Sequence, residues 1–226
     1  MIISISQPTL FPWLGYFDII KKSDIFVFLD NVKFEKRSWQ MRNKLKTISN
    51  NEEKEIWIRI PTKCVTSDTK INEVKIDNSQ NWKNKHINSF TENYGKTFRE
   101  IEFINEIYNQ EWEKLSEFNI KFISECCKYL EIKTPLKKAS ELNTYGKKSN
   151  LLLEICKKFN AKKYFSTVGS KEYLDKDKEI FDLSKIDIIY HEFKHPMYLQ
   201  KGRNFISHLS VLDLLFNEKI NAKKFF

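Results

Sequence analysis

The sequence predicts an α/β fold with a doubly wound, mainly parallel sheet of about five strands in a Rossmann-like arrangement. Two observations lead to this prediction. Residues 2–6 and 25–29 are short β-prone segments separated by a stretch with helical spacing, which is the pattern of a β-α-β unit. In the second half of the chain, three more strand-like segments alternate with helix-like segments, at residues 136–142, 163–167 and 187–193.

The first β-α-β unit defines an expected ligand-binding edge. Residues 2–6 alternate Ile and Ser, and this strand must end at Gln7 because Pro8 has no amide hydrogen for a further ladder bond. Residues 25–29 are all apolar, as expected for a strand covered on both faces. The carboxyl ends of parallel strands share one edge of a sheet. We therefore expect Gln7 and Asp30 to lie side by side where open α/β sheets bind ligands.

Helices are predicted from recurring apolar positions. Pro12 suits the first turn of the first helix, after which apolar residues recur at roughly helical intervals at Trp13, Leu14, Phe17 and Ile20. Later segments with similar spacing are residues 149–159, 171–183 and a tail helix at 205–216. These helices supply the crossovers that a parallel sheet needs.

The length favours one α/β domain over residues 1–226, since a chain of this size suits a single large core. An insertion of short strands is expected at about 40–76, followed by about three helices at about 81–131. Within the insertion, the candidate antiparallel strands are residues 42–47 and 55–61, with 71–76 as a third.

Composition places the chain among globular proteins. Hydrophobic residues make up 41% and aromatic residues 14%, which excludes global disorder. Lys and Arg exceed Asp and Glu by 39 to 30, a net charge of +9 that favours an anionic partner. Codon bias of an AT-rich genome also explains scattered lysines, so both explanations stay open. The one dense basic cluster comprises Lys33, Lys36, Arg37, Arg42, Lys44 and Lys46.

The cysteines and the N-terminus bear on location and metal content. None of the four cysteines forms a C-x-x-C pair or lies near a histidine at ligand spacing, so we expect no metal. No basic segment followed by an apolar one opens the chain, and no apolar run approaches the roughly 18 residues of a membrane span. We therefore expect a cytoplasmic protein with reduced thiols.

Six segments stand in order along the chain: QPTLFPWLGYF, IFVFLDNVKF and RSWQMRNKLK near the start, and KEYL, HPMYLQ and SVLDLLFN near the end. They resemble the WbqC-like protein family, found with bacterial O-antigen and capsule biosynthesis genes, over nearly the whole chain. The resemblance implies a transferase of lipopolysaccharide or capsule biosynthesis. Such an enzyme would attach an acyl or aminoacyl group, such as glycine, to the amino group of a nucleotide-linked amino sugar.

Asp30 is the first candidate catalytic residue. It ends an apolar strand, where a carboxylate is costly unless it is paired, bound to a metal or exposed in a cleft. It would be either a structural partner of Arg37 or Arg42, or a general base with the arginines on phosphate. Asn43 is expected at the same edge as a further substrate contact.

Gln7 is the second candidate, since a polar amide at a buried strand end must find a hydrogen-bond partner. It occupies the place where nucleotidyltransferase-like folds carry a phosphate-binding turn and a histidine motif. No histidine stands there in this chain, so that analogy concerns topology alone, and a nucleotidyltransferase-like enzyme is kept as a minority alternative.

The segment after the last strand contributes a third group of candidates. His195 is expected at the sheet edge as an acid, base or substrate contact, with Tyr198 and Gln200 as substrate contacts in the same family-like segment. Ser166 begins a segment that could accept an anion on free amides, although it has too few glycines for a P-loop. The other histidines are assigned to structure: His86 to a helix surface, His191 to a strand and His208 to the tail helix.

Three function classes follow. The leading hypothesis is the transferase, with a nucleotide-linked sugar as substrate and an unidentified activated acyl or aminoacyl donor, ATP-dependent or not. The second is a non-catalytic binding or assembly protein of the polysaccharide machinery, which uses its aromatic surface and tail helix to bind a partner. The tail helix is also the candidate contact for an oligomer. Nucleic-acid binding is a third, which would need a basic face interleaved with exposed aromatic residues. Apart from that class, nucleic acid is expected only as an aminoacyl donor. None of the cysteines is expected to act as a nucleophile, since no histidine lies near any of them.

Overall fold

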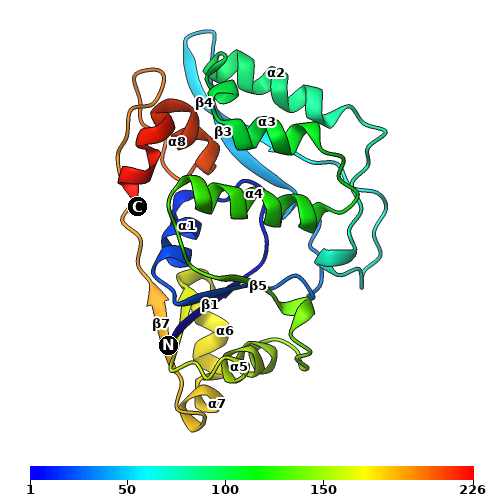
Figure 1. The fold of residues 1–226 in the computed structure, drawn as a ribbon, viewed down its shortest axis with the longest axis vertical. Helices are drawn as coiled ribbons and strands as arrows, with labels where there is room; N and C mark the ends of the chain where they lie inside the picture. Colours follow the sequence, from blue (N-terminus) through cyan, green and yellow to red (C-terminus); the bar gives the residue numbers. More distant parts are fainter.

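The central sheet has five parallel strands in the order β5-β2-β1-β6-β7 (Figure 1). A computed structural model describes all 226 residues of the chain. The strands are β1 (Ile2–Ser6), β2 (Ile25–Phe28), β5 (Leu136–Lys138), β6 (Lys163–Thr167) and β7 (Asp187–His191). All five lie where the sequence predicts them, so the α/β fold with a parallel five-stranded sheet is confirmed.

The order of the strands has one reversal point. The chain starts at the centre with β1 and adds β2 and β5 on one side. It then crosses back to add β6 and β7 on the other side. The reversal therefore falls between β1 and β6, and it opens a crevice at their carboxyl ends because the connections there lead away in opposite directions.

Alternating side chains divide the sheet between two cores. Ile3 and Ile5 of β1, with Ile25 and Val27 of β2, pack against helices on one face. Those helices are α5 (Ser149–Lys158), α6 (Lys171–Lys176) and α7 (Lys178–Leu183). Phe26 and Phe28 point to the other face and join the larger core. Helices therefore cover both faces, as the apolar β2 segment predicts.

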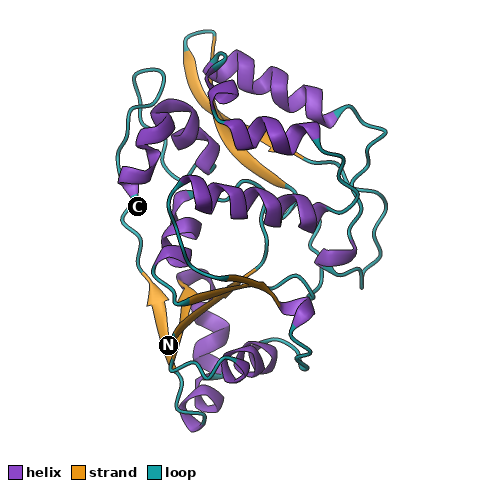
Figure 2. Cartoon of the chain, in the orientation of Figure 1, coloured by secondary structure: helices purple, strands orange, loops and turns teal.

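The larger core lies between the sheet and the inserted segments (Figures 1 and 2). An antiparallel hairpin forms a separate two-stranded sheet from β3 (Arg42–Ser49) and β4 (Glu52–Arg59). The helices that complete this half are α1 (Leu14–Lys21), α2 (Trp82–Tyr94), α3 (Glu102–Asn109), α4 (Leu115–Tyr129) and α8 (Val211–Glu218). The predicted insertion of short strands followed by helices is therefore present.

Two predicted elements differ from those observed. Residues 71–76 do not form a third strand: Ile71–Glu73 is a 3-10 helix, and only isolated bridges join Ile76 to Thr62 and Lys75 to Lys114. The predicted helix 171–183 is two short helices that meet at Asp177.

The tail helix also starts later than predicted. Ser210 caps it by accepting a hydrogen bond from the backbone N–H of Leu212 at 3.2 Å, so the helix begins at Val211. Residues 205–209 form a loop that leads into this cap. Residues 211–216 are all buried, so the apolar side of α8 packs inside this chain.

A buried carboxylate joins α8 to the rest of the larger core. Asp213 accepts hydrogen bonds from the hydroxyls of Tyr94 and Tyr198 at 2.6 and 2.8 Å, and from Nε2 of Gln200 at 2.8 Å. Burial raises the pKa of Asp213, whereas these hydrogen bonds lower it. The HPMYLQ and SVLDLLFN segments therefore meet at this one side chain.

Asp213→Ala is expected to lower the free energy of unfolding by about 3 kcal/mol, since three buried donors lose their acceptor together. Urea denaturation monitored by circular dichroism measures this difference. The matched control is Asp182→Ala, because Asp182 is exposed and its side chain makes no hydrogen bond or ion pair. Equal midpoints for the two variants would contradict the role of Asp213.

Candidate functional site

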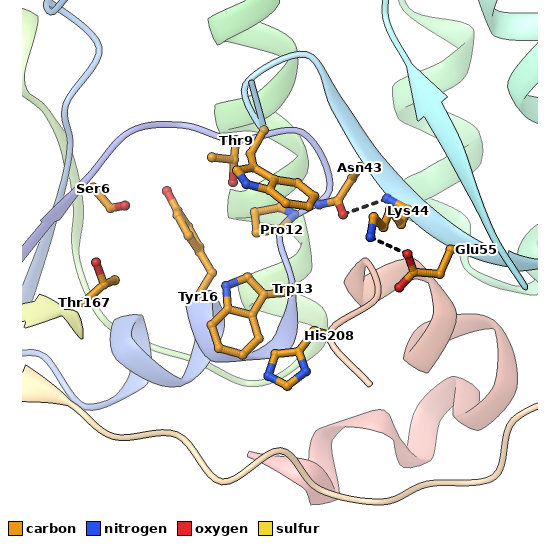
Figure 3. Close-up of a pocket in the computed structure, with 11 residues that line it drawn as sticks. Ser6, Thr9, Pro12, Trp13, Tyr16, Asn43, Lys44, Glu55, Thr167 and His208 are labelled. Atoms are coloured by element: carbon orange, nitrogen blue, oxygen red, sulfur yellow. Dashed lines mark hydrogen bonds and ion pairs between the residues drawn. The ribbon is translucent and has the colours of Figure 1, made fainter. Parts of the chain in front are cut away.

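A cavity of about 440 Å³ opens at the reversal point of the sheet (Figure 3). Ser6 at the end of β1 and Thr167 at the end of β6 form one wall. The residues that line it are Ser6, Thr9, Pro12, Trp13, Tyr16, Trp39, Asn43, Lys44, Glu55, Thr167 and His208. They come from the sheet edge, the β1–α1 loop, α1, the loop between β2 and β3, the hairpin and the loop before α8. We call this space the switch-point cavity, and its place is where doubly wound sheets bind ligands.

Side-chain amides hold the β1–α1 loop in place. Nδ2 of Asn43 donates to the carbonyl oxygens of Leu10 and Phe11 at 2.9 and 2.8 Å. Nδ2 of Asn119 in α4 donates to the carbonyl oxygen of Pro8 at 3.2 Å. Because this loop is buried, its carbonyl groups need such partners in place of water. The loop is therefore a fixed wall of the cavity.

Trp13 forms an aromatic part of the wall, and Gly15 makes room for it. A Cβ atom at Gly15 would lie only 2.3 to 2.7 Å from ring atoms of Trp13. The indole also stacks on the imidazole of His208, with ring centroids 5.2 Å apart and an interplanar angle of 29°. Glycine at position 15 thus lets the indole lie flat along the start of α1.

His208 faces the switch-point cavity from the loop before α8 (Figure 3). Its Nδ1 is 2.8 Å from Oγ of Ser207, and its Nε2 has no hydrogen-bond partner in the protein. The backbone of His208 is left-handed, with φ of 61°. An exposed imidazole with a free nitrogen can bind a ligand or exchange a proton with it.

The remaining cavity walls offer hydroxyl groups and one ion pair. The hydroxyl of Tyr16 donates to the carbonyl oxygen of Gln7 at 3.0 Å, and burial raises the pKa of Tyr16, so the hydroxyl stays protonated. Lys44 and Glu55 form an ion pair across the hairpin, drawn as a dashed line in Figure 3. The cavity therefore presents polar groups without a large net charge.

Two exposed tryptophans lie at one edge of the cavity: Trp39 lines it, and Trp57 packs next to Trp39. Trp39 is 51% exposed and Trp57 is 48% exposed, and their ring centroids are 5.5 Å apart. The guanidinium carbon of Arg42 lies 4.2 Å from the centroid of Trp57. Water-exposed indoles are costly, and such rings are suited to stack on a base or a sugar face. The predicted binding residue Arg42 therefore packs against this pair of tryptophans.

Asp30 does not pair with Arg37 or Arg42, the partners that the sequence analysis predicts. Its buried carboxylate accepts hydrogen bonds from the backbone N–H of Ser140 at 2.9 Å and from Oγ of Ser140 at 2.6 Å. Arg37 is exposed with a left-handed backbone, and neither it nor Arg42 pairs with Asp30. The reason is topological: β5 pairs with β2, which brings the turn after β5 next to the end of β2.

His195 lies in an aromatic cluster behind the switch-point cavity. Its ring centroid is 5.0 Å from that of His208 and 5.7 Å from that of Phe205. Nδ1 is 2.8 Å from the carbonyl oxygen of Pro196, whereas Nε2 is buried without a partner. Burial lowers the pKa of His195 and thus favours its neutral form.

The other predicted residues are dispersed. Tyr198 and Gln200 bind Asp213, and Ser166 is buried in β6 with Oγ 3.4 Å from the hydroxyl of Tyr164. Gln7 lines a different cavity. Of the predicted site residues, only Asn43 lines the switch-point cavity, while Asp30, Arg42 and His195 line neither of these two cavities.

Two histidine predictions are also corrected. His86 is buried, with hydrogen bonds to the hydroxyl of Tyr108 at 2.7 Å and the carbonyl oxygen of Arg59 at 2.8 Å, and burial lowers its pKa to about 4. His208 precedes the tail helix instead of lying within it. The missed signal is Ser210, a preferred N-cap residue that would have placed His208 in a loop.

The cysteines do not supply a nucleophile to either cavity. Burial raises the pKa of Cys127 and of Cys156 to about 12, and it also raises that of Cys126. Cys64 is exposed and lines neither cavity. No three His, Cys, Asp or Glu side chains gather as a metal-binding group. No helix has the length and apolar character to cross a membrane.

Comparisons with known proteins agree with the six segments noted in the sequence. The chain is 30% identical over 221 residues to Rv1507c, an uncharacterized protein of Mycobacterium tuberculosis (strain ATCC 25618 / H37Rv), covering 95% of this chain and 93% of the relative. No solved structure gives a significant match. The model of the WbqC-like protein family matches residues 7–225. The chain therefore belongs to the WbqC-like protein family.

Proposed function

We propose that this protein is a transferase of bacterial surface-polysaccharide biosynthesis, which carries an acyl or aminoacyl group to the amino group of a nucleotide-linked amino sugar. The observation that carries the proposal is the switch-point cavity. Its volume of about 440 Å³ suits a small ligand, and its place matches the ligand crevice of other doubly wound sheets. Family membership supports this role, because WbqC-like proteins are found with bacterial O-antigen and capsule biosynthesis genes.

The cavity residues divide into two groups with different chemistry. The hydroxyls of Ser6, Thr9 and Thr167 can bond the many hydroxyl and amino groups of a sugar. Trp39, with its neighbour Trp57 just outside the cavity, provides flat apolar surface for the base or a sugar face. The amino sugar would occupy the hydroxyl-lined end, with its nucleotide toward the tryptophans.

His208 would act as the general base. In the transfer, the sugar nitrogen forms a bond to the carbonyl carbon of the donor, and the bond from that carbon to its leaving group breaks. The nitrogen must also lose a proton, which the free Nε2 of His208 can accept at the cavity wall. The Lys44–Glu55 ion pair would help to orient the sugar.

One observation favours the alternative of a non-catalytic binding protein. The carboxylate of Asp30 is already bonded by Ser140, so the strongest base candidate of the sequence has a structural partner. Incubation of the protein with nucleotide-linked amino sugars and candidate acyl or aminoacyl donors separates the two functions. A mass gain of the sugar supports transfer, whereas binding without a mass gain supports the alternative.

Trp39→Ala is expected to weaken the binding of a nucleotide-linked amino sugar about tenfold, since stacking on one aromatic ring contributes about 1 to 3 kcal/mol. Isothermal titration calorimetry with UDP- and dTDP-linked amino sugars measures the change. Tyr145→Ala is the control, because Tyr145 is 82% exposed and lines neither cavity. Equal affinities for Trp39→Ala and the wild type would show that Trp39 does not contact the bound sugar nucleotide.

His208→Asn is expected to lower kcat by about 100-fold while the Kd for the sugar changes little, as for the loss of a general base. Asparagine tolerates the left-handed backbone at this position, so the loop should keep its path. Single-turnover kinetics followed by mass spectrometry gives the rate. An unchanged rate in a folded variant would exclude His208 as the base.

Asp30→Asn is expected to lower stability and to leave kcat nearly unchanged, the reverse of the result expected for His208→Asn. The variant weakens the bonds from Ser140 and should lower the free energy of unfolding by about 1 to 3 kcal/mol, with kcat close to that of the wild type. A thermal melt beside the same kinetic assay tests this. A large loss of kcat with no loss of stability would restore Asp30 as a catalytic residue.

A further inference from the structure

We infer that a second cavity, on the opposite face of β1 from the switch-point cavity, binds the phosphate groups of a nucleotide. Its volume is about 770 Å³. The residues that line it are Gln7, Leu29, Val32, Lys33, Glu35, Lys148, Leu151, Leu152, Tyr173, Lys176 and Asp177. We call it the Gln7 cavity. It would serve a second ligand, separate from the sugar nucleotide of the proposed transfer.

The end of β1 separates the two cavities. Ser6 lines the switch-point cavity and Gln7 lines the other, because consecutive residues of an extended chain point to opposite faces. Ile3 and Ile5 pack against α5 to α7, and Gln7 continues that face to the sheet edge. A ligand beside Gln7 and one beside Ser6 would thus lie on opposite sides of a single strand.

The orientation of the Gln7 amide is determined by its neighbours. The backbone N–H of Glu35 donates to Oε1 of the buried Gln40 at 3.3 Å, so the Nε2 group of Gln40 must point away from Glu35. That Nε2 donates to Oε1 of Gln7 at 2.7 Å. The Nε2 group of Gln7 therefore has no partner in the protein and offers two hydrogen atoms at the cavity wall.

Other donors surround the same space. Lys33 and Lys148 form no ion pair, while Lys176 pairs with Glu172 at 3.0 Å. Two carboxylates, Glu35 and Asp177, also line the cavity and form no ion pair. The site is therefore mixed in charge: the amide and the lysines suit phosphate oxygens, and carboxylates suit ribose hydroxyls.

The first turn of α5 adds backbone donors to this wall. No side chain caps α5, a helix of ten residues, and Oγ of the buried Ser149 has no hydrogen-bond partner. Gly146, with φ of 117°, leaves the backbone N–H of Leu151 uncovered, since a Cβ there would lie 3.2 Å from that nitrogen. Leu151 lines the cavity and Ser149 does not, so the uncovered amide of Leu151 is the donor of this turn that suits a ligand accepting hydrogen bonds.

The apolar part of the cavity favours a nucleotide over free phosphate. Leu29, Val32 and Leu152 supply an apolar wall, and Tyr173, which is 42% exposed, supplies an aromatic ring. Inorganic phosphate would leave these groups in water, whereas a base and ribose would cover them.

Calorimetric titration of the full chain with ADP tests the site, with inorganic pyrophosphate as a parallel probe. Gln7→Glu preserves an oxygen for Gln40 but turns the free donor into a carboxylate oxygen, and Lys148→Asn removes a positive charge. Each is expected to weaken ADP binding about tenfold or more. The matched control is Lys158→Asn at the other end of α5, which should leave the affinity unchanged.

Two further comparisons identify the occupant. Tyr173→Ala should weaken ADP binding but not pyrophosphate binding, and an equal loss for both probes would overturn the assignment to a nucleotide. ADP binding that is absent in the wild type, or that responds to Trp39→Ala but not to Lys148→Asn, would overturn the site itself. The proposed transfer is judged separately by sugar-nucleotide binding and mass gain, so either idea can fail alone.

Discussion

The buried carbonyl groups of the β1–α1 loop are the constraint on which the functional half of the molecule depends. This loop lies inside the protein, so each carbonyl oxygen must find a donor other than water. Asn43 of β3 and Asn119 of α4 provide these donors. The hairpin and α4 are thereby attached to the sheet through the one loop that shapes the switch-point cavity.

The parts of the fold that were predicted correctly are mostly those with a clear hydrophobic pattern within a few residues. The alternation in residues 2–6 and the apolar run at 25–29 depend on a period of two and on burial, which are visible within a few residues. The prediction of a strand at residues 71–76 was wrong. Its sequence resembles a strand, but in the structure the segment forms only single bridges, to Thr62 and Lys114. Pairing over such distances depends on the tertiary arrangement, which a short window does not contain.

The site was harder to predict than the sheet. Gln7 and Asn43 line cavities near the carboxyl ends of the strands, but these are two different cavities, and Asp30, Arg42 and His195 line neither. The partner of Asp30 could not be deduced, because Ser140 is 110 positions away and reaches Asp30 only once β5 pairs with β2. His208 was overlooked because its role depends on where the tail helix begins.

The burial of α8 in the larger core has a consequence for folding. Residues 211–216 are all buried in the larger core, and Asp213 holds side chains from α2 and from the loop after β7. The hairpin and α1 to α4, which supply the rest of this core, all precede α8 in the sequence. Without α8 in place a large apolar surface stays uncovered, so the larger core closes only when segments from both halves of the chain meet.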